Sequence, residues 1–116
     1  MKNKFSHYDP EIDDLIISNK EENEKVKRNF MFDDFIISIT RSGKIVGLEI
    51  RNASKFLEES GLNPSILEKI KEAKLIIVPK RDLIYIGVIF IFEEENHIIE
   101  RKVPITHIPM EAALSN

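Results

Sequence analysis

Residues 35–50 read FIISITRSGKIVGLEI, and this stretch decides how the first half of the chain folds. In its first part, apolar side chains alternate with mostly smaller or polar ones, which is the period of a half-buried strand. The polar segment around Gly43 then supplies a residue suited to the positive φ of a hairpin turn. We therefore expect a return strand after this turn, with Val46, Leu48 and Ile50 facing a core.

Three further short strands are predicted on the N-terminal side of this hairpin. Their ranges are 5–8, 14–18 and 25–32. Asp9-Pro10 separates the first strand from the second, because proline lacks a donor for strand pairing and favours a turn. A polar, acidic loop over 19–23 separates the second from the third. Together with the hairpin, these strands form a predicted antiparallel meander.

Two consecutive short helices are predicted after the meander. Asn52 is placed to cap the first helix, which runs through Glu59. Asn63 followed by Pro64 is a stronger start signal for the second helix, which we expect to continue to Glu72. The apolar stripe of this second helix consists of Ile66, Leu67, Ile70 and Ala73.

The last part of the chain is predicted to return to β-structure, in three antiparallel strands. Their ranges are 74–78, 83–93 and 97–105, with turns at 79–82 and 94–96. The predicted fold class is therefore α+β, in a single domain over residues 1–116, with a sheet packed on a helical layer.

The stretch 83–92 reads LIYIGVIFIF and is apolar on both faces, whereas a strand with one solvated face would alternate. Both faces of this strand therefore need a cover. A second copy of the chain would supply one, and the expected interface residues are Ile84, Ile86, Val88, Phe90 and Phe92. The alternative is that the meander and the helices cover both faces within one chain. We expect a homodimer, because a chain of this length has little material for three layers.

Two motifs near the ends of residues 7–57 carry a family resemblance. The first begins Tyr8-Asp9 and continues through an acidic stretch, including Asp13, into a short strand that contains Leu15. The second reads VGLEI over residues 46–50 and is followed by Ala53-Ser54. This arrangement resembles the small prokaryotic family called domain of unknown function 2283. The resemblance implies a fold for residues 7–57, with a helix and a β extension over 58–116, and it implies no activity.

Charge and composition exclude several classes of protein. A net charge of −3 gives no basic excess for non-specific binding to nucleic acid or to an anionic membrane. The absence of cysteine excludes disulfides, thiolate nucleophiles and cysteine-based zinc sites. The longest apolar run is about half the roughly 20 residues of a membrane-spanning helix, and no apolar signal segment follows the N-terminal basic residues. We expect a cytoplasmic prokaryotic protein without a cofactor; its bias toward Ile, Lys and Glu fits a thermophile or an AT-rich genome.

An acidic segment around the first turn offers the candidate metal ligands His7, Asp9, Glu11 and Asp13. Clustered carboxylates suit Ca²⁺ or Mg²⁺, so a metal-dependent enzyme or a ligand-binding protein is one alternative function. The segment lacks the central glycine and closing glutamate of an EF-hand. The other interpretation makes Asp9 the cap of the turn at Pro10 and leaves the remaining acids solvated. No residue is assigned as catalytic, because no serine lies in a Gly-x-Ser-x-Gly elbow.

RNA binding through the third predicted strand is a second alternative. Lys25, Lys27 and Arg28 precede Phe30 and Phe32 in this strand, and the two aromatic rings could stack on bases. Further basic residues are expected near another edge: Lys80, Arg81, Arg101 and Lys102. The ribonucleoprotein signature is absent, however, and interleaved glutamates remove the positive footprint expected of an RNA-binding face. Nucleic acid is therefore not an expected partner.

The function that we expect is that of a small protein-interaction module, homodimeric and without catalysis of its own. Its partners would be a second copy of the chain and a small protein. Analogy alone suggests a regulatory role like that of an antitoxin or a chaperone.

Overall fold

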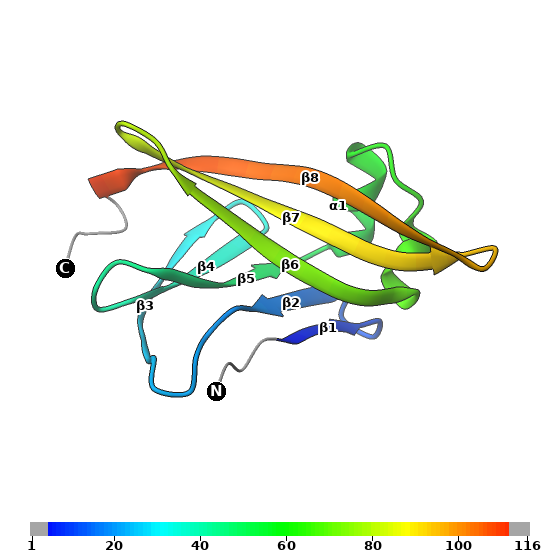
Figure 1. The fold of residues 1–116 in the computed structure, drawn as a ribbon, viewed down its shortest axis with the longest axis horizontal. Helices are drawn as coiled ribbons and strands as arrows, with labels where there is room; N and C mark the ends of the chain where they lie inside the picture. The colour runs from blue at the N-terminus through cyan, green and yellow to red at the C-terminus, as the bar shows by residue number, and fades with distance from the viewer. Residues whose placement is uncertain (1–4, 112–116) are drawn as a thin grey trace.

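The computed structural model describes residues 5–111 as two antiparallel β-sheets packed face to face, with a short helix at one end (Figure 1). The elements are β1 (Phe5–Asp9), β2 (Asp14–Ser18), β3 (Val26–Phe32), β4 (Phe35–Thr40), β5 (Ile45–Ile50), α1 (Ala53–Glu59), the 3-10 helix η1 (Pro64–Glu68), β6 (Ile70–Pro79), β7 (Leu83–Glu94) and β8 (His97–Pro109). This is a mixed α+β fold, as predicted. The predicted layering is wrong, because the first sheet packs on the second sheet rather than on a layer of helices.

The strand order of the first sheet, β1-β2-β5-β4-β3, differs from that of a sequential meander. Leu48 of β5 pairs with Ile17 of β2 on one side and with Ile37 of β4 on the other. The chain therefore crosses to the far edge of the sheet after β2 and returns through β3 and β4. Because β5 is the most buried strand, it takes the centre, and the more exposed β1 and β3 form the edges.

A bulge in β5 changes which of its residues reach the core. The register of β4 against β5 shifts after Ser38, so that Val46 is an extra residue in β5. Ile45 therefore joins the core cluster with Leu48 and Ile50, whereas Val46 is buried outside that cluster. The prediction that Val46 faces the core is wrong for this reason.

The prediction of a second helix is correct for its first turn and wrong for the residues after it. Its start is correct, since the Asn63 side chain accepts a hydrogen bond from the Ser65 backbone N–H at 2.9 Å and Pro64 begins η1. The chain then enters β6 at Ile70, which pairs with Phe92 of β7. Pairing along a long neighbouring strand outweighs the local preference for helix.

A second bulge explains why this segment has a helix-like spacing of apolar residues. The register of β6 against β7 shifts between Ile70 and Glu72. Ile70 and Ala73 consequently both face the core although they are three positions apart. A helical stripe and a bulged strand thus produce the same pattern in sequence.

Helix α1 closes one end of the sandwich. Its Ala53 and Leu57 are fully buried in the core cluster, and the Phe56 ring meets the Phe35 ring edge-on at 5.4 Å. Within residues 5–111, neither α1 nor η1 has the length and apolar character needed to cross a membrane.

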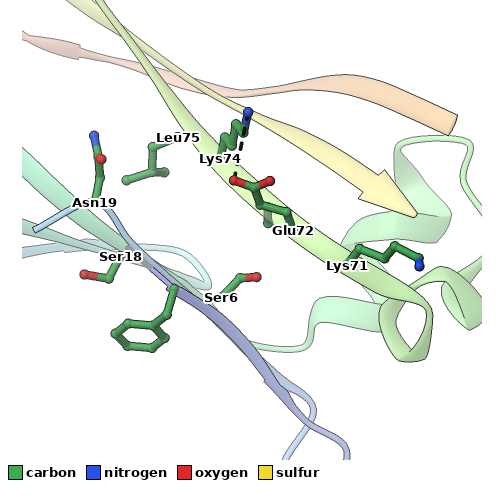
Figure 2. A pocket seen from close by; sticks show the side chains of 9 residues that line it. Ser6, Ser18, Asn19, Lys71, Glu72, Lys74 and Leu75 are labelled. Carbon is green, nitrogen blue, oxygen red and sulfur yellow. Dashed lines mark ion pairs between the residues drawn. The ribbon is translucent and has the colours of Figure 1, made fainter. Parts of the chain in front are cut away.

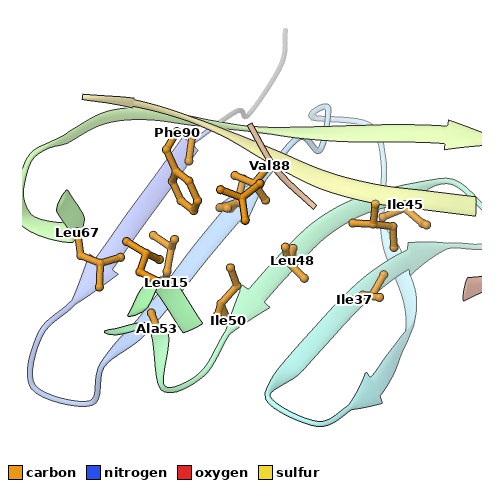
Figure 3. Packing of buried hydrophobic residues seen from close by; sticks show 14 of the residues in the cluster. Leu15, Ile37, Ile45, Leu48, Ile50, Ala53, Leu67, Val88 and Phe90 are labelled. Atoms are coloured by element: carbon orange, nitrogen blue, oxygen red, sulfur yellow. The ribbon is translucent and has the colours of Figure 1, made fainter. Parts of the chain in front are cut away.

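The residues that the sequence suggested for a dimer interface lie inside a single chain. Ile84, Ile86, Val88, Phe90 and Phe92 are at most 6% exposed and belong to the core cluster. Figure 3 shows two of them, Val88 and Phe90, directed from β7 toward the side chains of the first sheet. The first sheet therefore covers this one face of β7, whereas the alternative interpretation supposed that both faces are covered within one chain.

Candidate functional site

Asp13, a candidate metal ligand, is the centre of a hydrogen-bond network that ties the β1–β2 turn to α1. The Tyr8 hydroxyl donates to Asp13 Oδ1 at 2.6 Å, and the Ser54 hydroxyl donates to the same atom at 2.7 Å. The Ser54 backbone N–H donates to the two carboxylate oxygens at 3.1 and 3.2 Å. Asp13 thus caps the first turn of α1, whereas the side chain of the predicted cap Asn52 makes no capping bond.

The electrostatics of this network keep Asp13 ionised. Burial acts to raise the pKa of Asp13, but the hydrogen bonds from Tyr8 and Ser54 together outweigh it and lower the pKa. Burial and the hydrogen bond to Asp13 raise the pKa of Tyr8. The two carboxylate oxygens of Asp13 thus accept hydrogen bonds from Tyr8 and Ser54 and connect the β1–β2 turn to α1.

The other candidate metal ligands do not converge on a site. Asp9 Oδ1 accepts a hydrogen bond from the Glu11 backbone N–H at 3.0 Å, which confirms that Asp9 caps its turn. Glu11 is exposed, and His7 is exposed on the edge strand β1. In the part of the chain that the structure describes, no three His, Asp or Glu side chains come together as a metal site requires.

A pocket of about 440 Å³ lies between the β1–β2 hairpin and β6 (Figure 2). Its lining residues are Phe5, Ser6, Ser18, Asn19, Lys71, Glu72, Ala73, Lys74 and Leu75. Its single carboxylate, Glu72, forms an ion pair with Lys74 at 3.9 Å. The pocket is lined by two serines and no histidine, and the hydroxyl of Ser18 accepts a hydrogen bond from the Lys20 backbone N–H at 3.3 Å.

The aromatic residues of β3 do not form an open platform for bases. Phe30 and Phe32 pack against the core cluster, and their ring centroids are 6.1 Å apart. The series of rings continues from Phe32 to Phe35 at 5.3 Å. The prediction of RNA binding through this strand therefore loses its stacking element.

The second sheet leaves its outer face open. Tyr85, Ile89 and Ile91 lie on the side of β7 opposite the core and are half-buried. Val78 and Leu83, at one end of the sheet, are 40% and 42% exposed. No described helix or strand covers this surface, because α1 and the first sheet lie on the inner side (Figure 1). We call this surface the outer face of the second sheet.

The strand register arranges the outer face in rows of opposite charge. The basic row is Lys74 of β6, Ile89 of β7 and Lys102 of β8; the acidic row next to it is Glu72, Ile91 and Glu100. All four charged residues are exposed, and each row has an isoleucine at its centre. The outer face therefore combines an apolar strip along β7 with ordered charges on both sides.

An aromatic cluster lies toward the basic end of the outer face. The Tyr85 ring lies over Gly87, where an added Cβ would be 2.6 Å from the tyrosine hydroxyl. The ring of His107 is 5.3 Å from that of Tyr85, centroid to centroid. The ammonium groups of Lys80 and Lys102 lie 5.8 and 6.0 Å from the Tyr85 ring centroid, within cation–π range.

The outer face of the first sheet is less uniform. Met31 and Ile16 are 65% and 37% exposed there, but the carboxyl group of Glu49 interrupts the apolar surface between β2 and β4. A hydrogen bond with Asp14, together with burial, raises the pKa of Glu49. The outer face of the first sheet thus has exposed apolar side chains around a carboxyl group, whereas no charged residue lies on β7 between Tyr85 and Ile91.

The five residues that the sequence suggested for an interface belong to the core of one chain, and Tyr85, Ile89 and Ile91 form the opposite side of β7. The sequence signal for which side is the core was that Phe90 and Phe92 share one side of the strand, whereas Gly87 lies on the other. The charged rows had no signal in sequence, because they exist only once the β6–β7–β8 register is known. Comparison of the chain with family models, curated proteins and solved structures finds no match.

Proposed function

We propose that this protein is a small protein-interaction module that works as a homodimer and performs no catalysis itself. The observation that supports it is the outer face of the second sheet, where the apolar strip of β7 has no cover among the described elements. Burying apolar surface stabilises association by roughly 25 cal/mol per Å². In a cytoplasmic setting, the dimer would act as a regulator of a small protein partner.

The proposed relation to domain of unknown function 2283 concerns the fold rather than the function. Tyr8, Asp13 and Ser54 belong to the motifs that resemble the family, and here they form one hydrogen-bond network. Such a network gives a physical reason for these residues to occur together without any activity.

The outer face is large enough for a weak, specific dimer. With a rise of about 3.4 Å per residue and strands about 4.8 Å apart, its three strands span roughly 500 Å². Two copies would then bury about 1,000 Å², which is near the lower limit for a specific interface.

Oligomeric state, measured by native mass spectrometry and sedimentation, tests the proposal. The wild type is expected to be a dimer. The Ile91→Arg variant should be a folded monomer, because its arginine would be buried against the partner's apolar strip. Ile16→Arg, on the outer face of the first sheet, is the matched control and should remain a dimer. A wild type that stays monomeric up to about 1 mM would overturn the proposal. The same spectra report any bound metal ion, which the acidic-segment alternative requires.

RNA binding is a second candidate, and the observation that favours it is the group of rings and cations around Tyr85 rather than the aromatic residues of β3. Tyr85 is an accessible aromatic ring with Lys80, Lys102 and His107 around it, a combination that suits a stacked base beside a phosphate. Retention on single-stranded RNA at low salt, lost in Tyr85→Ala, would support this candidate. Equal retention of both proteins would remove it.

A further inference from the structure

We infer that the partner on the outer face of the second sheet is a second copy of the chain packed with its strands antiparallel, so that each basic row lies on an acidic row. The inference rests on the proposed homodimer and adds its orientation. It follows from the order of charges on the face and from the symmetry of a pair of identical subunits.

Two identical faces that cover each other are related by a two-fold axis lying in the plane between them. If that axis crosses the strands between Ile89 and Ile91, the β7 strands run antiparallel and β6 lies over the partner's β6. Each basic row then covers the partner's acidic row, with Lys74 above Glu72 and Lys102 above Glu100. The two isoleucines of each subunit meet at the centre.

The other simple arrangement brings like charges together. If the axis runs along β7, the strands are parallel and each row covers the same row of the partner. Lys74 of one subunit would then lie above Lys102 of the other, and Glu72 above Glu100. Packing the sheets excludes water from these contacts, so the repulsion is stronger than on a free surface. Charge order therefore selects the antiparallel arrangement.

The charges at the two ends of the outer face also favour the antiparallel arrangement. The antiparallel arrangement brings the basic, aromatic end, with Tyr85 and Lys80, toward the acidic β7–β8 turn of the partner at Glu94 and Glu95. Within one chain, Lys74 and Glu72 form an ion pair across the two rows that spans 3.9 Å between side chains more than half exposed. Such a pair contributes little by itself, which leaves both rows open to a partner.

A row-swap variant tests the orientation. It combines Lys74→Glu and Lys102→Glu with Glu72→Lys and Glu100→Lys, so that net charge and apolar strip are unchanged. In the antiparallel arrangement the variant still forms its own dimer, but each mixed pair with wild type places like charges together. Native mass spectra of a refolded mixture should show mixed dimers about tenfold or more below the statistical proportion.

The control and the contrary outcomes are well separated. A swap of Lys55 and Glu59 on α1 lies away from the face and should give mixed dimers in statistical proportion. Statistical mixing of the row-swap variant, or a preference for mixed dimers, would overturn the antiparallel arrangement while leaving the homodimer in place. A monomeric wild type would instead remove the proposed function.

Circular dichroism checks the fold of the variant. Should the variant not fold, the wild type provides the test, because dimer affinity must fall as salt is raised.

Discussion

Asp13 adopts a positive φ of 57° and accepts hydrogen bonds from two residues that lie in other elements. Asp13→Ala would leave the Tyr8 hydroxyl and the Ser54 backbone N–H without their acceptor. It would also place alanine in the left-handed region, which disfavours residues with a plain Cβ. We expect the free energy of unfolding, measured in urea, to fall by about 2–4 kcal/mol. Asp9→Ala, at an exposed turn, is the control and should cost about 1 kcal/mol or less.

The acid limb of the stability curve provides a second readout of the same residue. Folding lowers the pKa of Asp13, so its contribution is present above the unfolded pKa of about 3.9 and is lost as the pH falls through the lower folded pKa. Asp13→Asn keeps an acceptor oxygen but does not titrate. The wild type should therefore lose more stability than this variant below about pH 4. Parallel acid limbs would show that Asp13 makes no ionic contribution.

At the scale of elements, β7 contains a place where the ring of one residue packs over the backbone of another. The Tyr85 ring covers Gly87, and a Cβ there would meet the ring hydroxyl at 2.6 Å. Gly87→Ala should therefore displace the ring and lower the free energy of unfolding by about 1–2 kcal/mol, despite the better strand propensity of alanine. In a Tyr85→Ala background, the same substitution should be neutral or stabilising. Additive effects in this double-mutant cycle would contradict the contact.

Sequence patterns predicted the elements better than their arrangement, and particular residues show why. The hairpin at Gly43, with its φ of 88°, and the turn before His97 rest on local chemistry that the sequence contains. The bulge at Val46 and the placement of β5 between β2 and β4 arise from pairing between distant segments. The cap of α1 likewise comes from Asp13, 41 positions before Ser54, so no local motif could assign it. The three-stranded sheet was predicted, but the charge order on its outer face needed the register.

At the scale of the whole molecule, the inner and outer faces of the sheets differ in how much of their apolar surface one chain can bury. The inner faces share one core, which includes Leu15, Leu48 and Phe90 (Figure 3). In the proposed homodimer, a second copy of the chain would cover the outer face of the second sheet. Stability should therefore depend on protein concentration, since a partner that binds only the folded chain stabilises it by mass action.

Thermal unfolding over a range of protein concentrations tests this coupling. Raising the total concentration about 100-fold should raise the Tm of the wild type by several degrees, because mass action shifts the unfolding free energy by about 2.7 kcal/mol at most. Ile91→Arg removes the proposed apolar contact, so its Tm should be the same at every concentration. Ile16→Arg should retain the concentration dependence, since it alters the other sheet. A constant Tm in the wild type would mean that the chain folds without its partner and that the outer face of the second sheet is stable in water.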